Sequence, residues 1–441
     1  MIALNDTSDM SSVRRPHVVI VGAGFGGINA AQALRGVDAD VTLVDANNYH
    51  LFQPLLYQVA IAGLDPDDIA YPIRALVRQR AHRHHRTAGT VAFRLGRVTA
   101  IAPASRQVSL ADGTTLTYDH LVLAAGAVTN TFGVPGADTN ALGMKSLRDA
   151  LSIRSALLRR FEQAASDVAA GRPFEPALLR IAVVGGGATG VELAGGLQEL
   201  VMHVLRRDFP TLPFDQARVT LVEATDRVLG TFAPRLTSKA AATLRQMGVE
   251  LVLGTGVGRI DPGVVVLADD RRTEAATIIW AAGVKAGPLA EASGLPLGRG
   301  GRIVVDEHLR VPAHPEIFVV GDIAASLAPD GATLLPQVAQ VAIQGGRHAG
   351  RAIAAALSSG ATPPGPFRYH DKGSMATIGR HAAVSQFPNG VRLSGPMGWL
   401  AWLGLHLVYL IGFRNRLSVL VNWTWNYLTY DHASRLIDGE G

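Results

Sequence analysis

The chain has 441 residues, enough for two or three domains, and 48% of them are hydrophobic, enough for substantial buried cores. Its formal charge of +5 comes from scattered basic residues that are not interleaved with stacking aromatic residues. We therefore expect no nucleic-acid partner, and a membrane surface is the better candidate for a basic protein of this kind. The absence of cysteine excludes disulfides, thiolate metal sites, iron–sulfur clusters and redox cycles through a disulfide.

The N-terminal residues 1–15 contain Asp6 and Asp9 and have no apolar stretch. A secretory signal needs an apolar segment and a transit peptide is poor in acidic residues, so the region fits neither. We predict a disordered lead-in, with the first domain beginning at residue 16.

Residues 18–45 carry the pattern of a dinucleotide-binding unit. A β-branched run at 18–21 predicts a buried strand, a helix is expected over 28–34, and a strand at 41–44 ends on Asp45. The G-x-G-x-x-G turn after the first strand consists of Gly22, Ala23, Gly24, Phe25, Gly26 and Gly27. Such glycines let a pyrophosphate approach the helix N-terminus, and the acid can bind a ribose hydroxyl. The alternative, a tight turn only, is disfavoured by the complete context.

The segment after this unit carries weaker signals. Asp65 and Pro66 are predicted to cap a helix that runs to about Arg80. The tract 80–86 holds three histidines and three arginines without acids, so we expect a solvated basic loop rather than a metal site, and no bound metal. A strand over 118–126 ends in the small residues Ala125 and Gly126, which allow close approach of a ligand.

A second unit repeats the first. One long helix is predicted from Ser146 to about Ala170, and a strand at 181–184 follows it. The glycine-rich turn after that strand contains Gly185, Gly187 and Gly190. A strand at 219–222 ends on Glu223, and a strand at 277–280 leads to Ala282 and Gly283, as the strand at 118–126 does in the first unit. This internal duplication indicates two dinucleotide sites in one chain.

Three further elements follow the duplication. A strand at 317–320 ends on Gly321 and Asp322, and a helix opens within 335–346 and continues to 358. Gln340 and Gln344 are four residues apart on that helix and share one face. Strands at 381–387 and 391–394 flank an Asn-Gly turn and predict a hairpin.

The C-terminal segment is apolar and aromatic. No charged residue lies between Arg392 and Arg414, but Gly395, Pro396 and Gly398 are expected to break its first turns, leaving about fifteen helical residues where a membrane span needs ~20. The segment holds the aromatic types that settle at headgroup depth: Trp399, Trp402, Tyr409, Trp423, Trp425, Tyr427 and Tyr430. We predict a helix on the membrane surface, with Arg414 and Arg416 near anionic lipid. The alternative is a buried core helix or a dimer interface.

With these motifs the chain resembles the type II NADH:quinone oxidoreductases, single-subunit flavoproteins that do not pump protons, over nearly its whole length. The resemblance implies an α/β fold with two Rossmann-like dinucleotide-binding domains, for FAD and NADH, and a C-terminal membrane-associating helical segment. We accordingly divide the chain into a lead-in (1–15), an FAD-binding domain in two parts (16–150 and 291–390), an NADH-binding domain (151–290) and the C-terminal segment (391–441).

The resemblance also implies residues for each cofactor. For FAD these are Gly22, Ala23, Gly24, Phe25, Gly26, Gly27, Asp45, Gln53, Ala125, Gly126, Gly321, Asp322, Ala339 and Gln340. For NADH they are Gly185, Gly187, Gly190, Glu192, Glu223, Ala282 and Gly283. The segments 53–60, 339–344 and 371–376 would surround the flavin ring. From the residue itself, Glu223 favours NADH over NADPH because a carboxylate repels a 2′-phosphate, a preference that Arg227 weakens.

Four residues are candidates for the chemistry. The resemblance places Glu192 beside the nicotinamide, where it would help to protonate the quinone; the alternative is an acid that only stabilises the helix dipole. Gln340 and Gln344 would hydrogen-bond the quinone or the flavin edge, or else form helix surface. Lys372 is the fourth candidate, with a solvated loop residue as the alternative.

The expected function is FAD-dependent oxidation of NADH with two-electron reduction of a membrane quinone, ubiquinone or menaquinone, in a respiratory chain. Without cysteine, electrons must pass directly from the flavin to the acceptor. The protein is expected to be peripheral (monotopic) on the cytoplasmic face of the cell membrane, in contact with surface lipids, and a homodimer is left open. The alternatives are a soluble ferredoxin- or rubredoxin-type reductase and an NADH-sensing flavoprotein related to apoptosis-inducing factors.

Overall fold

A computed structural model of the protein describes residues 14–78, 90–429 and 434–437. The chain forms two compact units, each built from separate stretches. The first unit comprises 1–48, 72–126 and 286–369, and the second comprises 49–71, 127–285 and 370–441. The division therefore falls at other residues than the predicted domain boundaries. Most of the predicted lead-in, the tract 80–86 and Tyr430 lie outside the described residues.

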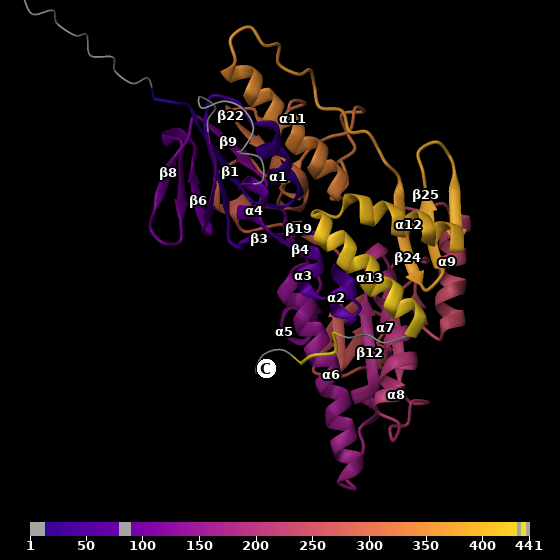
Figure 1. The fold of residues 1–441 in the computed structure, drawn as a ribbon. Helices are drawn as coiled ribbons and strands as arrows, with labels where there is room; N and C mark the ends of the chain where they lie inside the picture. The colour runs from indigo at the N-terminus through magenta and orange to yellow at the C-terminus, as the bar shows by residue number, and fades with distance from the viewer. Residues whose placement is uncertain (1–13, 79–89, 430–433, 438–441) are drawn as a thin grey trace, which may run out of the picture. The chain divides into compact units, whose positions relative to one another are not determined.

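A six-stranded sheet forms the core of the first unit, in the order β21-β22-β9-β1-β2-β5 (Figure 1). Its strands are β1 (His17–Val21), β2 (Asp40–Asp45), β5 (Val91–Leu95), β9 (His120–Leu123), β21 (Arg310–Val311) and β22 (His314–Val319). All pair in parallel except β21, which lies antiparallel at the edge. Val18, Val19 and Ile20 are fully buried, as a central parallel strand requires.

Two helices of the first unit, α1 (Phe25–Ala33) and α11 (Ala339–Leu357), pack closely against each other. A Cβ added to Gly346 would lie 2.1 Å from the carbonyl oxygen of Gly26, and one on Gly350 would lie 2.7 Å from that of Ala30. Only glycine allows such an approach. Both predicted helices are confirmed, although α1 begins at Phe25 and not at 28.

The remaining elements of the first unit surround this core. They are α4 (Ile73–Arg78), α10 (Leu289–Ala292), the antiparallel sheet of β6 (Val98–Ala102), β7 (Gln107–Leu110) and β8 (Thr115–Thr117), and the pair β20 (Ile303–Val304) and β23 (Ala324–Ala325). A short 3₁₀ turn, η6 (Gly321–Ile323), follows β22.

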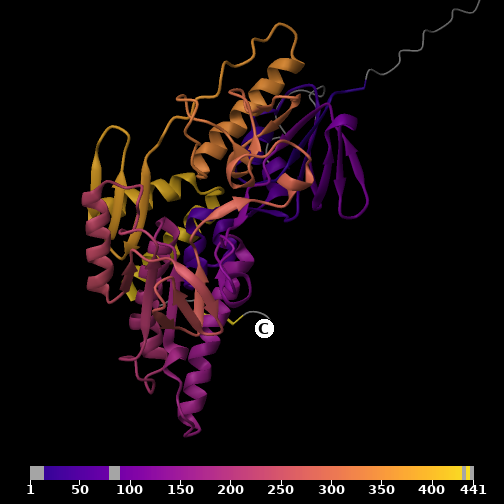
Figure 2. The same ribbon diagram turned by 180° about the vertical axis from the view of Figure 1, so that it is seen from behind.

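The second unit contains a five-stranded parallel sheet in the order β11-β18-β12-β13-β14 (Figure 2). The strands are β11 (Leu142–Gly143), β12 (Arg180–Val184), β13 (Arg218–Glu223), β14 (Glu250–Leu253) and β18 (Thr277–Trp280). Its helices include α6 (Leu147–Ala169), α7 (Ala188–Glu199), which continues as a π-helix (Leu200–Leu205) and α8 (Arg206–Asp208), and α9 (Pro234–Met247). The long predicted helix is confirmed: Ser146 caps α6, accepting a hydrogen bond from the N–H of Asp149.

The predicted helix from residue 66 to about 80 is wrong. The chain forms α3 (Pro66–Ile69), then strand β4 (Ala70–Pro72), and then α4. Asp65 does cap α3, as expected. Strand β4 pairs with β3 (Tyr49–Leu51), a partner more than fifteen residues away in sequence. A long-range strand pairing thus overrides the local helical preference.

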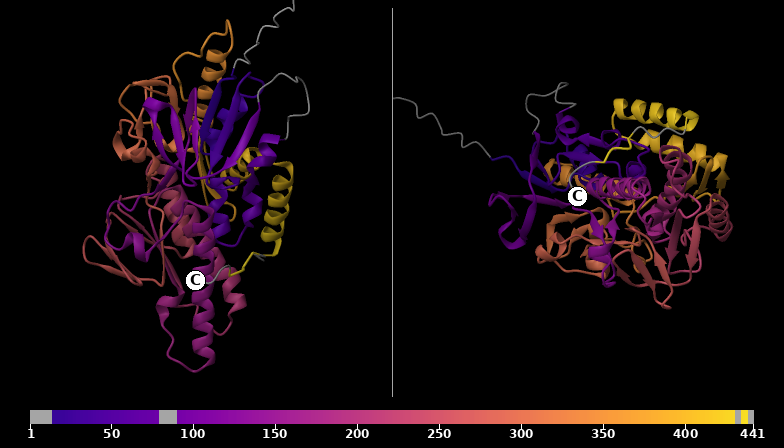
Figure 3. Two further views of the ribbon diagram at one scale, coloured as in Figure 1. Left: turned by 90° about the vertical axis from the view of Figure 1, so that its left-hand side faces the viewer. Right: turned by 90° about the horizontal axis from the view of Figure 1, so that it is seen from below.

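The C-terminal region begins with a three-stranded antiparallel sheet of β24 (Ser374–Gly379), β25 (Ala382–Gln386) and β26 (Arg392–Gly395). The predicted hairpin is confirmed as β25 and β26, and β24 was not predicted. Helix α12 (Pro396–Tyr409) begins at Pro396, with Gly395 as its N-cap. The expected break was therefore wrong: proline in the first turn lacks an N–H that would have no helical partner there. A second helix that was not predicted, α13 (Phe413–Thr429), follows (Figure 3).

Helices α12 and α13 each have two different faces. Trp402 is 1% exposed, and Val419 and Trp423 are also buried against the rest of the second unit. Phe413 and Leu428, by contrast, are 81% and 78% exposed. The segment is therefore partly core and partly apolar surface. Within the described residues, no helix combines the length and apolarity that crossing a bilayer requires.

Candidate dinucleotide and redox sites

The first glycine turn forms a cradle at the carboxyl end of β1. Gly22 has φ +98°, and its N–H donates to the carbonyl oxygen of Val44, 2.7 Å away. A Cβ on Gly27 would lie 1.7 Å from the carbonyl oxygen of Gly22, whereas one on Gly24, the N-cap of α1, would meet nothing within 4 Å. The backbone is thus compact on one side and open at the helix N-terminus, which is where a pyrophosphate binds.

Asp45 lies beside this cradle. Its Oδ2 accepts a hydrogen bond from the N–H of Ala23 at 2.7 Å, and its Oδ1 accepts one from the N–H of Asn47 at 2.7 Å. Burial raises the pKa of this carboxyl, and the two N–H groups oppose the rise. A carboxylate has about four acceptor positions, so capacity for ribose hydroxyls remains. Cradle and acid together fit an adenine dinucleotide.

The other predicted FAD residues of this unit gather at the same edge of the sheet. Ala125 and Gly126 follow β9, and Gly321 and Asp322 follow β22, so both pairs lie beyond the carboxyl ends of strands parallel to β1. Ala339 and Gln340 begin α11, and the preceding Gln337 side chain donates to the carbonyl oxygen of Asp322 at 2.9 Å. Gln53, the remaining one, lies in the second unit, where its side chain and that of Lys145 are hydrogen-bonded.

The second unit repeats the cradle at the carboxyl end of β12. Gly185 has φ +111°, and its N–H donates to the carbonyl oxygen of Val222 at 2.8 Å. A Cβ on Gly190 would lie 1.8 Å from the carbonyl oxygen of Gly185, while Gly187, the N-cap of α7, faces open space. Ala282 and Gly283 follow β18 at the same edge.

Glu223 occupies the position of Asp45 in this second cradle. Its Oε2 accepts from the N–H of Gly186 at 2.6 Å, and its Oε1 accepts from the N–H of Thr225 at 2.8 Å. Arg227 makes a two-point ion pair with Asp226 on the protein surface. The Arg227 guanidinium, which would favour a 2′-phosphate, is thus paired with Asp226 and not with Glu223.

The four predicted reaction residues are divided between the two units. Gln340 and Gln344 are half-buried on one face of α11 in the first unit. In the second unit, Glu192 is buried in the first turns of α7, and Lys372 is exposed in the loop before β24.

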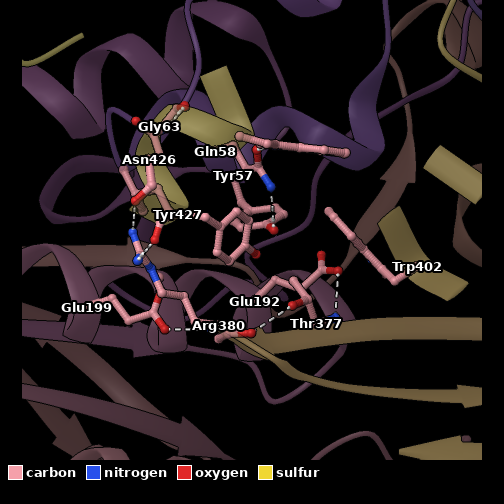
Figure 4. Close-up of a pocket in the computed structure, with 14 residues that line it drawn as sticks. Tyr57, Gln58, Gly63, Glu192, Glu199, Thr377, Arg380, Trp402, Asn426 and Tyr427 are labelled. Carbon is pink, nitrogen blue, oxygen red and sulfur yellow. Dashed lines mark hydrogen bonds between the residues drawn. The ribbon is translucent and has the colours of Figure 1, made fainter. Parts of the chain in front are cut away.

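Glu192 lines a small cavity of about 70 Å³ within the second unit (Figure 4). The carboxyl group lies next to Thr377 and Trp402, and its Oε1 accepts from the N–H of Thr377 at 3.3 Å. Burial raises the pKa of Glu192 to about 8; the Thr377 N–H opposes this, as does the nearby indole of Trp402, which does not reach full hydrogen-bond geometry. At neutral pH the group is mostly protonated, so it can donate a proton.

A second acid, Glu199, lies on the same side of α7 seven residues later. Its Oε1 accepts from the N–H of Arg380 at 2.6 Å, and burial raises its pKa while this N–H and the Arg380 charge oppose the rise. The Arg380 guanidinium also donates to the carbonyl oxygens of Asn426 and Tyr427 on α13 (Figure 4).

Sequence reasoning missed most of this cavity. Glu199, Arg380 and Asn426 were not singled out, and Tyr427 was expected at the membrane surface; only Tyr57 and Gln58 belong to the segment 53–60 that was expected around the flavin. The seven-residue spacing of two acids in a helix with no other charged residue was a usable signal for Glu199. No local signal marks Arg380, since its partners Glu199, Asn426 and Tyr427 lie more than forty residues away in the chain.

Two complete dinucleotide cradles in one chain without cysteine define a pyridine-nucleotide-dependent flavoprotein. Residues 16–346 match the family described as pyridine nucleotide-disulphide oxidoreductase, and residues 371–430 match the NDH2 C-terminal domain. The chain is 42% identical to the type II NADH:quinone oxidoreductase Ndh of Mycobacterium tuberculosis, over 94% of this chain and 89% of that protein. It is 32% identical to the Haemophilus influenzae enzyme of the same name, over 85% and 87%. The chain belongs to the type II NADH:quinone oxidoreductase family.

Solved structures share the fold. The structure of NDH2 from Plasmodium falciparum in complex with NADH matches with a TM-score of 0.85 at 20% identity, covering 97% of this chain and all of that one. Sulfide:quinone oxidoreductase from Aquifex aeolicus matches with a TM-score of 0.68 at 16% identity, over 95% of this chain and 96% of that one. The predicted α/β fold class with two dinucleotide-binding domains is confirmed.

The buried Glu192 gives a prediction about stability. An unfolded glutamate has a pKa near 4.5, so between pH 4.5 and about 8 the folded protein binds one more proton than the unfolded chain, and stability falls as the pH rises. Glu192→Gln removes this dependence. From pH 5 to pH 9 the stability of the variant should therefore rise relative to the wild type, by on the order of a few kcal/mol.

Thermal unfolding of the FAD-loaded proteins at both pH values measures this difference. The matched control is Glu162→Gln at an exposed position of α6, for which the gap to the wild type should stay nearly constant. If the difference in stability between Glu192→Gln and the wild type is also the same at both pH values, Glu192 is ionised in the folded protein at neutral pH.

Proposed function

We propose that the first cradle binds FAD, the second binds NADH, and the protein passes two electrons from NADH to a membrane quinone without pumping protons. The observation that carries this proposal is the repeated cradle. In each glycine turn the backbone N–H of the second residue donates a hydrogen bond to an acid: Ala23 to Asp45, and Gly186 to Glu223. The chain has no cysteine pair, so its residues position and protonate the reactants and take no electrons themselves.

The bound FAD supplies the hydride and electron transfer chemistry. The residues that would hold it are the cradle at 22–27, Asp45, and the backbone at 125–126 and 321–322. The corresponding residues for NADH are Gly185, Gly187, Gly190, Glu223 and the backbone at 282–283. We infer that Gln53 and Ala339 also contact the flavin.

Reduction of a quinone consumes two protons, and Glu192 is the group we assign to proton supply. A carboxyl with a pKa near 8 is protonated at neutral pH and can lose a proton within the operating range. Gln340 and Gln344 are assigned to hydrogen-bonding of the quinone carbonyl or the flavin edge. Lys372 is exposed on a loop, so of the four candidates its side chain is the least fixed in position by the fold.

The exposed apolar face of α12 and α13 is the part of the protein we assign to the membrane. It includes Val408, Phe413, Leu417, Val421, Trp425 and Leu428. Arg414 is exposed and available for anionic lipid, whereas the Arg416 guanidinium donates to the carbonyl oxygens of Leu410 and Val408 at the end of α12. We propose that the protein is monotopic on the cytoplasmic face of the cell membrane.

The function is tested on the purified protein by its spectrum. We expect a yellow flavoprotein that bleaches on addition of NADH and recovers its colour when quinone is added. NADPH should act at least ~10-fold less efficiently, because a phosphate beside Glu223 is costly in a partly buried site. Equal efficiency with NADPH would refute the role of Glu223, and lack of reoxidation by quinone would refute the quinone reductase.

Gln344→Ala tests the assignment of α11. We expect quinone reduction to slow by ~10-fold or more while reduction of the enzyme by NADH stays nearly unchanged, because only the step with quinone loses a hydrogen bond. Stopped-flow measurement separates the two half-reactions. Gln163→Ala, at an exposed position of α6, is the matched control, and equal damage to both half-reactions would assign Gln344 to the flavin scaffold.

Replacing Phe413 and Leu428 by glutamate tests the membrane face. Both are exposed, so the fold should survive, while two charges on the apolar face should move the protein from the membrane fraction to the soluble fraction. NADH oxidation with a soluble acceptor should persist as membrane-quinone reduction falls. Leu95→Glu, at an exposed leucine of the first unit, is the control and should leave the amount of protein in the membrane fraction unchanged. If the double variant stays on membranes, the outward face of α12 and α13 is not the membrane-binding face.

A further inference from the structure

A phenylalanine lies exposed beside the second cradle. Phe132 belongs to the segment between β10 (Ala127–Thr129) and α5 (Ala137–Asn140) of the second unit, and it is 64% exposed. A Cβ added to Gly283, which follows β18, would lie 2.9 Å from the Cζ of this ring. The edge of the ring therefore lies directly over the backbone of Gly283, while most of Phe132 is open to solvent.

Backbone packing places Gly283 at the border of the cradle. A Cβ on Gly185, the first glycine of the turn, would lie 2.5 Å from the Cα of Ala282. The backbone at 282–283 therefore borders the turn directly, and Phe132 lies immediately beyond it. The first unit differs at this point, because a Cβ on Gly126, which corresponds to Gly283, would meet nothing within 4 Å. The ring over this glycine distinguishes the second cradle from the first.

Three hydrogen bonds hold the segment that carries the ring. The N–H of Asn130 donates to the carbonyl oxygen of Gly283 at 3.0 Å, and the indole of the buried Trp280 donates to the carbonyl oxygen of Asn130 at 2.8 Å. The side-chain oxygen of Asn130 accepts from the N–H of Phe132 at 2.9 Å. The segment is therefore fixed to the carboxyl end of β18, and the fold sets where the ring lies.

Phe132 adopts a backbone conformation that a phenylalanine rarely takes. Its φ is +53°, in the left-handed region where a side chain crowds the following carbonyl oxygen. Because the residue is mostly exposed, burial of the ring offsets little of this strain. Backbone strain of this kind clusters at active sites and at residues that clamp a ligand. The strain therefore points to a contact made by the ring outside the protein's own core.

The order of the strands indicates which part of a dinucleotide would meet the ring. The sheet runs β11-β18-β12-β13-β14, so the cradle after β12 lies between the ends of β13 and β18. Glu223 ends β13, where the ribose of the adenosine half would bind. With the pyrophosphate at the N-terminus of α7, the other half of the dinucleotide extends toward β18 and Gly283.

We propose that the nicotinamide riboside half of NADH packs against the ring of Phe132, which makes Phe132 a further residue of the NADH site. This inference rests on the proposed function, in which the second cradle binds NADH. Stacking of a base-like ring on an aromatic side chain changes affinity by on the order of 10-fold. Holding the nicotinamide in one orientation also favours hydride transfer.

Calorimetric titration of the FAD-loaded protein with NAD⁺ and with ADP tests the proposal, since neither nucleotide reduces the flavin. ADP lacks the nicotinamide riboside. Phe132→Ala should therefore weaken NAD⁺ binding by ~10-fold or more and leave ADP binding within about 2-fold of the wild type. Phe132→Tyr keeps the ring and should retain the NAD⁺ affinity of the wild type. Val391→Ala, at an exposed apolar position in the turn between β25 and β26, is the matched control and should change neither affinity.

A second variant separates contact with the ligand from a role in the fold. Phe132→Gly removes the ring and also the backbone strain, because glycine adopts a positive φ readily. It should unfold at a higher temperature than Phe132→Ala and bind NAD⁺ as weakly. The proposal is overturned if both variants bind NAD⁺ as the wild type does, or if NAD⁺ and ADP binding weaken alike, since the ring would then only support the cradle. If the wild type binds neither nucleotide, the proposed function fails and this inference fails with it.

Discussion

The contact of backbone with backbone inside the two glycine turns is the constraint on which both units depend. Gly27 against Gly22, and Gly190 against Gly185, bring a helix so close to its strand that a methyl group would overlap a carbonyl oxygen. This closeness fixes the helix N-terminus at the carboxyl edge of the sheet, next to the acid that ends the second strand. One backbone packing contact in each unit therefore positions the groups that we propose for phosphate and ribose binding.

Burial then shifts the protonation equilibria of two carboxyl groups in the second unit. Helix α7 starts in the cradle and continues into the core, so the same helix that would bind a pyrophosphate at its N-terminus carries Glu192 and Glu199 away from water. Desolvation, the largest influence on Glu192, moves its pKa to about 8, and among the described residues no cation lies close enough to hold the carboxyl ionised. Glu199, by contrast, has the Arg380 charge nearby, and the two acids thus have different environments on one helix.

The parts of the structure that depend on short-range patterns were predictable from the sequence. Glycine spacing, strand periodicity and capping residues located both cradles, α6 and the hairpin of β25 and β26. Strand β4 and the lining of the cavity at Glu192 depend on partners far away in sequence, as with Arg380 and α13, so no local window contains the information. Pro396 was misjudged for another reason. Proline breaks a helix when it lies in the interior, but it is favoured in the first turn, which is where Pro396 lies.

The C-terminal helices show why one apolar segment supported two opposite predictions. In α12 both the inward and the outward faces are apolar, whereas α13 turns amides inward, where Asn415, Asn422 and Asn426 hydrogen-bond to the segment 63–68, and keeps apolar side chains on its outward face. Neither helix therefore shows the polar outward face by which an amphipathic surface helix of a globular protein is recognised. The inward face completes the cavity, where the Trp423 indole donates to the Gln58 side chain at 2.7 Å, while Phe413 and Leu428 lie on the outward face. Removing the helices would therefore expose core and, at the same time, discard the face that we propose as the membrane anchor. Only substitutions confined to the outward face separate the contribution of the segment to the fold from its contribution to membrane binding.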